Sequence, residues 1–171
     1  MTAEGSEHEG LGLRAILAAL ACVALTALAS SCRGGRDADA QTWVEVAGRR
    51  WRVRLATNED QWTRGLAGVE RLADDEGMLF VFSRAAVRGF WMRGCLIPLD
   101  VAFIDSGGKI VRMHTMPVGA GEDLPTYSSD VPVRYALEVP AGGLEKAGVR
   151  VGEAVTFSPA ILEVTKGRGV P

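Results

Sequence analysis

The sequence has few of the residues from which common catalytic and metal sites are built. Its 171 residues include three cysteines and two histidines. There is no G-x-S-x-G, P-loop, C-x-x-C or H-E-x-x-H motif, which disfavours four large classes of enzyme and binding protein. An odd and low cysteine count also excludes a small domain held together by disulfides. No metal and no cofactor are therefore predicted.

Neither sign of charge is in excess. The 19 basic and 21 acidic residues give a net charge of −2, and the longest basic run is the pair Arg49 and Arg50. A nucleic-acid partner is therefore not expected, because such proteins carry a clustered basic surface. Hydrophobic residues make up 47% and charged residues 23% of the chain, as in ordinary globular proteins. The length suits one domain preceded by a targeting segment.

The long apolar run of this sequence lies near the N-terminus. Residues Ala15–Ala29 are apolar apart from one threonine, and Arg14 is the only charge between Leu11 and Ser31. The run is shorter than the roughly 20 residues that span a bilayer and fits the apolar part of a signal peptide. The end of the run and the three residues after it read Leu-Ala-Ser-Ser-Cys (residues 28–32), which resembles the bacterial lipobox. We therefore predict a signal peptide over 1–32 and lipidation of Cys32.

These features predict an exported protein attached to a membrane, in the periplasm or at the cell surface. Two alternatives remain, namely an uncleaved membrane anchor and soluble secretion after cleavage at Ala27-Leu28-Ala29. All three place the domain outside the cytoplasm. Residues 33–41 are polar and contain glycine, which predicts a flexible tether. We expect one folded domain over 42–165 and a short tail over 166–171.

Alternation with a period of two dominates the domain. Apolar Trp51, Val53 and Leu55 alternate with three arginines, which predicts a strand with one buried and one solvated face. Residues 97–104 and 109–116 are predicted to form a hairpin, because Asp-Ser-Gly-Gly between them is typical of a turn.

The remaining pattern consists of short elements. Met78–Phe82 is a continuous apolar run and predicts a fully buried strand, and residues 133–139 alternate again. Short helices are expected after Thr57 and over 143–148, a long loop over 117–132, and closing strands over 153–158 and 160–164. The predicted fold is mainly β (α+β), a compact single domain whose antiparallel sheet is barrel- or sandwich-like with two short helices.

Four segments together make the sequence recognisable. They are Arg64-Gly65-Leu66, Glu76–Phe80 (EGMLF), Phe90–Asp105 (FWMRGCLIPLDVAFID) and Tyr135–Gly142 (YALEVPAG). With these motifs the chain resembles the domain-of-unknown-function family 192, small uncharacterised and often exported prokaryotic proteins, over about residues 53–156. The resemblance implies a compact, strand-rich single domain. It implies no activity, because the activity of the family is unknown.

The sequence departs from the family pattern at three positions. Gly94 and Cys95 stand where members commonly have asparagine and threonine, and Ala67 stands where methionine is usual. A site that depended on that asparagine amide would be altered in this chain.

Asp100 is an acidic residue inside an otherwise apolar strand, between Leu99 and Val101. A carboxyl group that faces inward must be hydrogen-bonded or paired, or its pKa rises. One interpretation makes Asp100 a general acid or base, or the residue that fixes a ligand. The other makes it structural, bonded to backbone N–H groups of the loop 91–95 or paired with Arg93 or Arg134.

Glu138 and His114 complete the set of candidate catalytic residues. Glu138 is a second carboxyl group in a strand, and a pair with Asp100 would suit acid–base chemistry if the two converge. The alternative is a solvated strand face shared with Arg134. His114 is the only imidazole in the domain, and Cys95 would need it as a base. Otherwise Cys95 is a buried and inert thiol.

The residues favour a small-ligand binding or accessory module, with Trp91, Met92, Arg93, Asp100 and Tyr127 as ligand-binding residues. Trp91 and Met92 would line an apolar pocket, Arg93 would suit an anionic group, and Tyr127 lies in the long loop. Ordinary core packing is the alternative for the first two. Two other functions remain open, a small hydrolase or lyase and a structural partner of an envelope complex. The expected partners are the membrane and a small molecule or an envelope protein.

Overall fold

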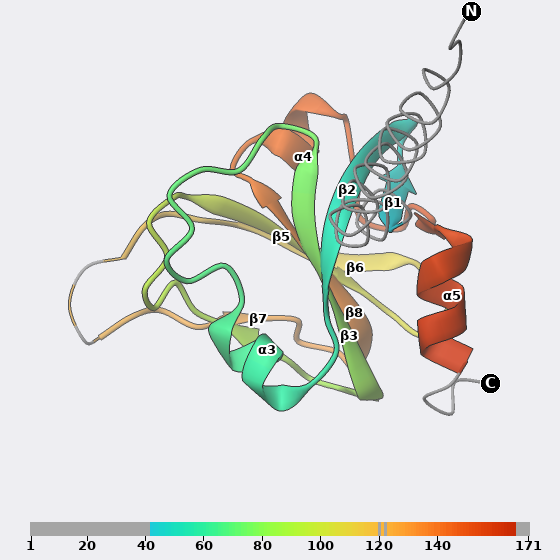
Figure 1. Cartoon of the computed structure of the whole chain (residues 1–171), viewed down its shortest axis with the longest axis horizontal. Helices are drawn as coiled ribbons and strands as arrows, with labels where there is room; N and C mark the ends of the chain where they lie inside the picture. Colours follow the sequence, from blue (N-terminus) through green and yellow to red (C-terminus); the bar gives the residue numbers. More distant parts are fainter. Residues whose placement is uncertain (1–41, 120, 122, 167–171) are drawn as a thin grey trace, which may run out of the picture. The chain divides into compact units, whose positions relative to one another are not determined.

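The computed structural model describes residues 42–119, 121 and 123–166, and these residues form one domain. The predicted signal peptide, the tether, Cys32 and most of the tail lie outside the described residues. The domain is mostly β, and Figure 1 shows a sheet that curls into a half-barrel with the helices around it. The strands are β1 (Trp43–Val46), β2 (Arg49–Ala56), β3 (Glu76–Ala86), β4 (Gly89–Phe90), β5 (Leu99–Ile104), β6 (Ile110–Met116), β7 (Tyr127–Ser128), β8 (Val133–Pro140) and β9 (Thr156–Phe157). The helices are α3 (Glu59–Arg64), α4 (Gly143–Lys146) and α5 (Pro159–Lys166).

Seven strands form the main sheet in the order β6-β5-β8-β3-β2-β1-β9, and β4 pairs with β7 in a second, two-stranded sheet. The predicted hairpin is confirmed as β5 and β6, which pair with Leu99 opposite Met116. The pair β2–β3 is parallel, in contrast to the antiparallel sheet expected. This crossover runs through α3, which gives the chain the length that a parallel connection requires.

Both faces of the sheet are covered, so the domain has two hydrophobic cores. The first core contains Trp51, Leu79, Ala102, Leu137 and Ile161, and α4 and α5 contribute residues to it. The second core lies on the other face and is covered by α3, the loop after it and the β4–β7 pair. Its members include Phe80, Phe82, Met92, Phe103 and Ala136. Alternation along each strand assigns neighbouring residues to different cores.

The closing segment differs from the prediction. Residues 160–164, expected as a strand, belong to helix α5, and the strand expected over 153–158 is confined to β9. The helix starts at Pro159, where the fixed φ of proline and its missing N–H suit the first helical turn. Ile161 and Thr165 are four residues apart and share the buried face. The domain therefore has three helices rather than two.

Helix α3 was predicted to follow Thr57, and it begins at Glu59. Asn58 is the N-cap, and its side chain accepts a hydrogen bond from the Gln61 N–H at 3.0 Å. Gly65 ends the helix with φ +48°, a conformation that other residues rarely adopt. This abrupt end turns the chain back towards the second core and leads into the candidate site.

Candidate functional site

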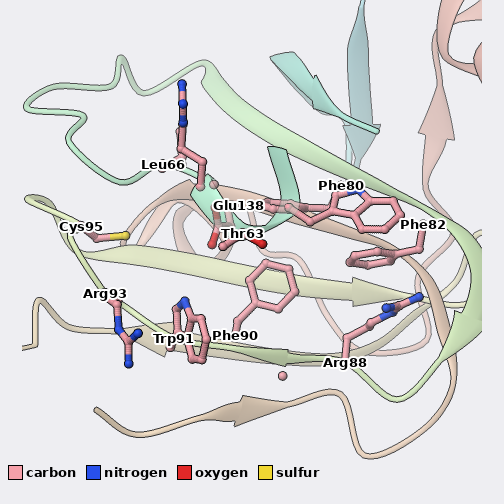
Figure 2. Close-up of a pocket in the computed structure, with 14 residues that line it drawn as sticks. Thr63, Leu66, Phe80, Phe82, Arg88, Phe90, Trp91, Arg93, Cys95 and Glu138 are labelled. Atoms are coloured by element: carbon pink, nitrogen blue, oxygen red, sulfur yellow. The ribbon is translucent and has the colours of Figure 1, made fainter. Parts of the chain in front are cut away.

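A cavity of about 220 Å³ lies on the second core, between α3 and the segment 88–95. Figure 2 shows its aromatic walls, with the Glu138 carboxyl group among them and Arg88, Trp91 and Arg93 along one side. The lining residues come from α3 and its end, from β3, from the segment that includes β4, and from β8. They are Trp62, Thr63, Arg64, Gly65, Leu66, Phe80, Phe82, Arg88, Gly89, Phe90, Trp91, Arg93, Cys95 and Glu138.

Glu138 is the residue that distinguishes this cavity from ordinary core. Strand alternation turns its side chain away from Leu137 and into the second core, where it is 4% exposed. Its Oε2 atom is buried and has no hydrogen-bond partner among the described residues. Burial raises the pKa of Glu138 to about 8. The neutral, protonated form therefore predominates at pH 7, and it has one O–H donor available.

The backbone approaches this carboxyl group closely at Gly65. A side chain at position 65 would begin 3.8 Å from Glu138 Oε2 and 3.4 Å from the Phe80 ring. These are ordinary contact distances, so it is the positive φ at the end of α3 that favours glycine here.

Three arginines line the cavity, and none of them forms an ion pair within the described part of the chain. They are Arg64, Arg88 and Arg93. The Arg88 guanidinium lies 4.1 Å from the centroid of the Phe82 ring and donates through Nη2 to the carbonyl oxygen of Arg84. Its Nε atom is buried and has no partner in the described residues. Burial, followed by the nearby Arg84 charge, lowers the pKa of Arg88.

Cys95 forms part of the cavity wall as a free, buried thiol. Burial raises the pKa of Cys95, and the Glu138 carboxylate raises it further when ionised. A reactive cysteine needs the opposite effect, because the thiolate is the nucleophile. This environment keeps the thiol protonated and suits a wall residue.

The three departures from the family pattern lie close to one another at this site. The Gly68 N–H donates to the Gly94 carbonyl oxygen at 2.8 Å, and this bond ties the loop after α3 to the segment before β5. Gly94 has φ +72°, and a side chain there would begin 3.3 Å from the Ala67 methyl group. Small residues at both positions therefore allow this contact beside Cys95.

The structure brings together some of the predicted ligand-binding residues and separates others. Trp91, which is 47% exposed, and Arg93 line the cavity, with the Arg93 guanidinium 4.7 Å from the centroid of the Trp91 ring. Met92 is buried in the second core, and neither it nor Tyr127 lines the cavity. The Tyr127 ring packs 5.7 Å from the His114 ring instead.

Asp100 lies on the opposite face of the sheet from the cavity. Its Oδ1 accepts a hydrogen bond from the Thr115 hydroxyl at 2.8 Å, and its Oδ2 accepts one from the Leu144 N–H at 3.1 Å. These partners differ from those expected, which were the loop 91–95, Arg93 and Arg134. Asp100 joins β5 to β6 and to α4, which is a structural arrangement.

The structure does not bring the three candidate catalytic residues together. In the β5–β8 ladder Glu138 is opposite Val101, and Asp100 is opposite Val139, so the two carboxyl groups face different cores. His114 reaches neither of them. Its Nε2 atom lies 2.9 Å from the Ser128 carbonyl oxygen, and its ring follows Phe103 in a row of aromatic contacts. The geometry contradicts an acid–base pair of Asp100 and Glu138.

Sequence reasoning missed much of the cavity wall. Four lining residues were not predicted as site residues, namely Arg88, Phe80, Phe82 and Trp62. Arg88 precedes the motif-rich segment Phe90–Asp105 by only two residues. Phe80 and Phe82 alternate with Leu79 and Val81, which contribute to the other core. This alternation would have indicated which residues of β3 face the cavity. It is not visible in the sequence, because residues 78–82 are all apolar.

Two features, a group of side chains that could hold a metal ion and a helix that could cross a membrane, are absent from residues 42–119, 121 and 123–166. No group of three or more histidine, cysteine or acidic side chains is arranged to hold a metal ion there. Helices of the length and apolarity that crossing a membrane requires do not occur in the same ranges.

Comparisons with known proteins identify the family but no activity. The model of the family DUF192, described as an uncharacterized ACR, matches residues 42–157. A crystal structure from Sinorhizobium meliloti 1021, described as a "putative transcription regulator", is 33% identical with a TM-score of 0.63, covering 68% of this chain and 92% of that chain. A protein of unknown function from Novosphingobium aromaticivorans DSM 12444 is 26% identical with a TM-score of 0.61, covering 67% of this chain and 83% of that one. No curated protein matches the sequence.

Proposed function

The chain belongs to the DUF192 family, whose proteins are uncharacterized, and we propose that it is a binding module for a small organic molecule that occupies the Glu138 cavity. One observation carries this proposal. A carboxyl group that is 4% exposed points into an aromatic cavity with one oxygen unpaired among the described residues.

An unpaired buried carboxyl group is costly, which is why such groups are rare. Transferring a polar group out of water without a hydrogen bond costs about 1–3 kcal/mol in proteins. A leucine or methionine at position 138 would avoid this cost and fill the space. A ligand that supplies the missing partner explains why a carboxyl group is present.

The size of the cavity restricts the ligand. A protein cavity of about 150 Å³ accommodates a benzene molecule. The cavity here, about 220 Å³, therefore has room for a single ring with one or two small substituents. Its aromatic walls favour a flat, apolar body, and its polar atoms would orient that body.

Binding is favoured over the hydrolase or lyase alternative. Chemistry with two carboxyl groups requires both of them at one site, typically about 5–10 Å apart. Asp100 faces the other core and is bonded through both oxygens, which leaves Glu138 as the sole acidic side chain lining the cavity in the described part of the chain.

A panel of single-ring acids, amides, amines and alcohols would test the proposal, with binding detected by ligand-observed NMR. We expect at least one compound to bind the native protein and to lose binding in Thr63→Phe, which places a ring at the exposed α3 position beside the cavity. The matched control is Thr156→Phe, at an exposed position of β9. The proposal fails if no compound binds, or if binding survives Thr63→Phe unchanged.

We also propose that the protein is exported and attached to a membrane by a lipid on Cys32. The support is the apolar run 15–29 and the lipobox-like sequence that follows it. Cells fed a clickable palmitate should label the native protein and the control variant Cys22→Ser, and should not label Cys32→Ser. Equal labelling of both variants would contradict the proposal.

A further inference from the structure

The charges around the cavity define the chemical class of its ligand. We infer that the ligand is a small aromatic carboxylate, and that it binds when Glu138 carries its proton. This inference rests on the proposed binding function and specifies both the ligand and the way its binding is regulated.

The first argument is charge. The cavity is lined by Arg64, Arg88 and Arg93, and among the described residues Glu138 is the only acidic one in the lining. None of the three guanidinium groups has a carboxylate partner in the described residues. With Glu138 protonated, the lining carries positive charge and no negative charge, which favours an anion.

The second argument is the pairing of buried polar atoms. Arg88 Nε–H is an unsatisfied donor, and the protonated Glu138 carboxyl offers another. Each of these donors would be satisfied by a ligand that presents an acceptor to it. A carboxylate provides two acceptor oxygens, and hydrogen bonds to an ionised acceptor are about twice as strong as neutral ones. The aromatic walls, with Phe80, Phe82 and Phe90 among them, suit the ring that carries this carboxylate.

Proton linkage follows from the position of Glu138. Ionised Glu138 would place a negative charge in the cavity, and a carboxylate ligand would be repelled. The charged or titratable groups of the lining are Arg64 at the end of α3, Arg88 and Arg93 on the two sides of β4, and Cys95 in the segment before β5. From β3 the lining receives only phenylalanines. Glu138 is therefore the group that controls ligand release as the pH rises.

Benzoate, benzamide and benzylamine form a matched set of probes with one ring and a negative, neutral or positive substituent. Titrated against the native full-length protein by ligand-observed NMR at pH 6.5, benzoate should bind at least tenfold more tightly than the other two. If benzamide or benzylamine binds as tightly as benzoate, or if benzoate does not bind, the inference is wrong. The broader panel and the Thr63→Phe variant decide the binding function separately.

Two variants test the roles of Arg88 and Glu138. Arg88→Gln should weaken benzoate at least tenfold and leave benzamide unchanged, whereas the exposed control Arg150→Gln should change neither. If only the protonated form of Glu138 binds, native affinity for benzoate falls about 30-fold between pH 6.5 and 9.5, given a pKa of about 8.

Glu138→Gln keeps a neutral donor and removes the ionisation. This variant should retain benzoate binding and lose the pH dependence, whereas Cys95→Ala should retain both. A pH dependence that persists in Glu138→Gln, or that disappears in Cys95→Ala, would overturn the assignment to Glu138.

Discussion

Two buried carboxyl groups on adjacent strands of one sheet have opposite environments. Asp100 on β5 is 3% exposed and accepts hydrogen bonds through both oxygens, from Thr115 and Leu144. Glu138 on β8 is 4% exposed, faces the other core and has one oxygen, beside a cavity, without a partner among the described residues. Burial is thus nearly equal, and the difference lies in the partners. The hydrogen-bond partners, rather than the degree of burial, distinguish the structural carboxyl group of Asp100 from that of Glu138, which is available to a ligand.

The largest expected effect is on the pH dependence of stability. The pKa of Glu138 is raised to about 8 in the folded protein, so the folded state keeps a proton that the unfolded state loses near pH 4.5. Its contribution to stability is therefore fully present below pH 4.5 and is lost as the pH rises towards 8. At about 1.4 kcal/mol per pH unit, the total is roughly 5 kcal/mol.

Glu138→Gln removes this contribution, because an amide does not ionise. The difference in stability between this variant and native protein therefore measures the contribution of Glu138. Denaturant unfolding at several pH values should show the stability of Glu138→Gln, relative to native protein, rising by several kcal/mol between pH 4.5 and 8. The exposed control Glu145→Gln on α4 should run parallel to native protein. If the stability of Glu138→Gln also follows that of native protein at every pH, the ionisation of Glu138 does not affect stability. The two carboxyl groups would then not differ in the way described above.

The next largest effect concerns Asp100. In Asp100→Asn an amide group replaces one acceptor, and a buried donor, the Leu144 N–H or the Thr115 hydroxyl, is left without a partner. The free energy of unfolding should fall by about 3 kcal/mol at pH 7. Hydrogen exchange should show faster exchange at the Leu144 amide than in native protein. If Asp100→Asn is as stable as native protein, the structural interpretation of Asp100 is incorrect.

The smallest effect is on the reactivity of Cys95. Ionised Glu138 raises the pKa of this thiol, so Glu138→Gln should increase its rate of alkylation at pH 9, by less than tenfold. Asp100→Asn is the matched control, because Asp100 faces the other core. Mass spectrometry of the Cys95 peptide would give the rate. An equal increase in both variants would indicate general loosening of the domain instead of an effect of the Glu138 charge.

Much of the fold could be predicted because it depends on local patterns. Alternation predicted β2, the Asp-Ser-Gly-Gly turn predicted the hairpin of β5 and β6, and the apolar run 78–82 lies in β3. The parallel pairing of β2 with β3 was missed, since alternation within a strand carries no information about its neighbours. Helix α5 was missed because Ala160–Val164 is short and apolar apart from Glu163, and a run of that length is compatible with both a strand and a helix.

The candidate site was predicted less completely than the fold. Trp91, Arg93 and Glu138 were identified as candidates and line one cavity. Alternation along β5 puts Asp100 on the same face as Ala102 and Ile104, but the pattern does not show which face of the sheet contains a cavity. Arg88 comes from a separate segment, and only tertiary packing brings it into the same cavity lining as Glu138.

The account depends most directly on the ionisation of Glu138, which carbon-13 NMR of glutamate side-chain carboxyl groups would measure. The Glu138 resonance is assigned by its absence in Glu138→Gln. We predict that it titrates with a pKa of about 8 in the free protein and that benzoate moves this pKa higher. A Glu138 resonance that titrates near 4.5 and does not respond to benzoate would show an ordinary ionised side chain and would contradict the account.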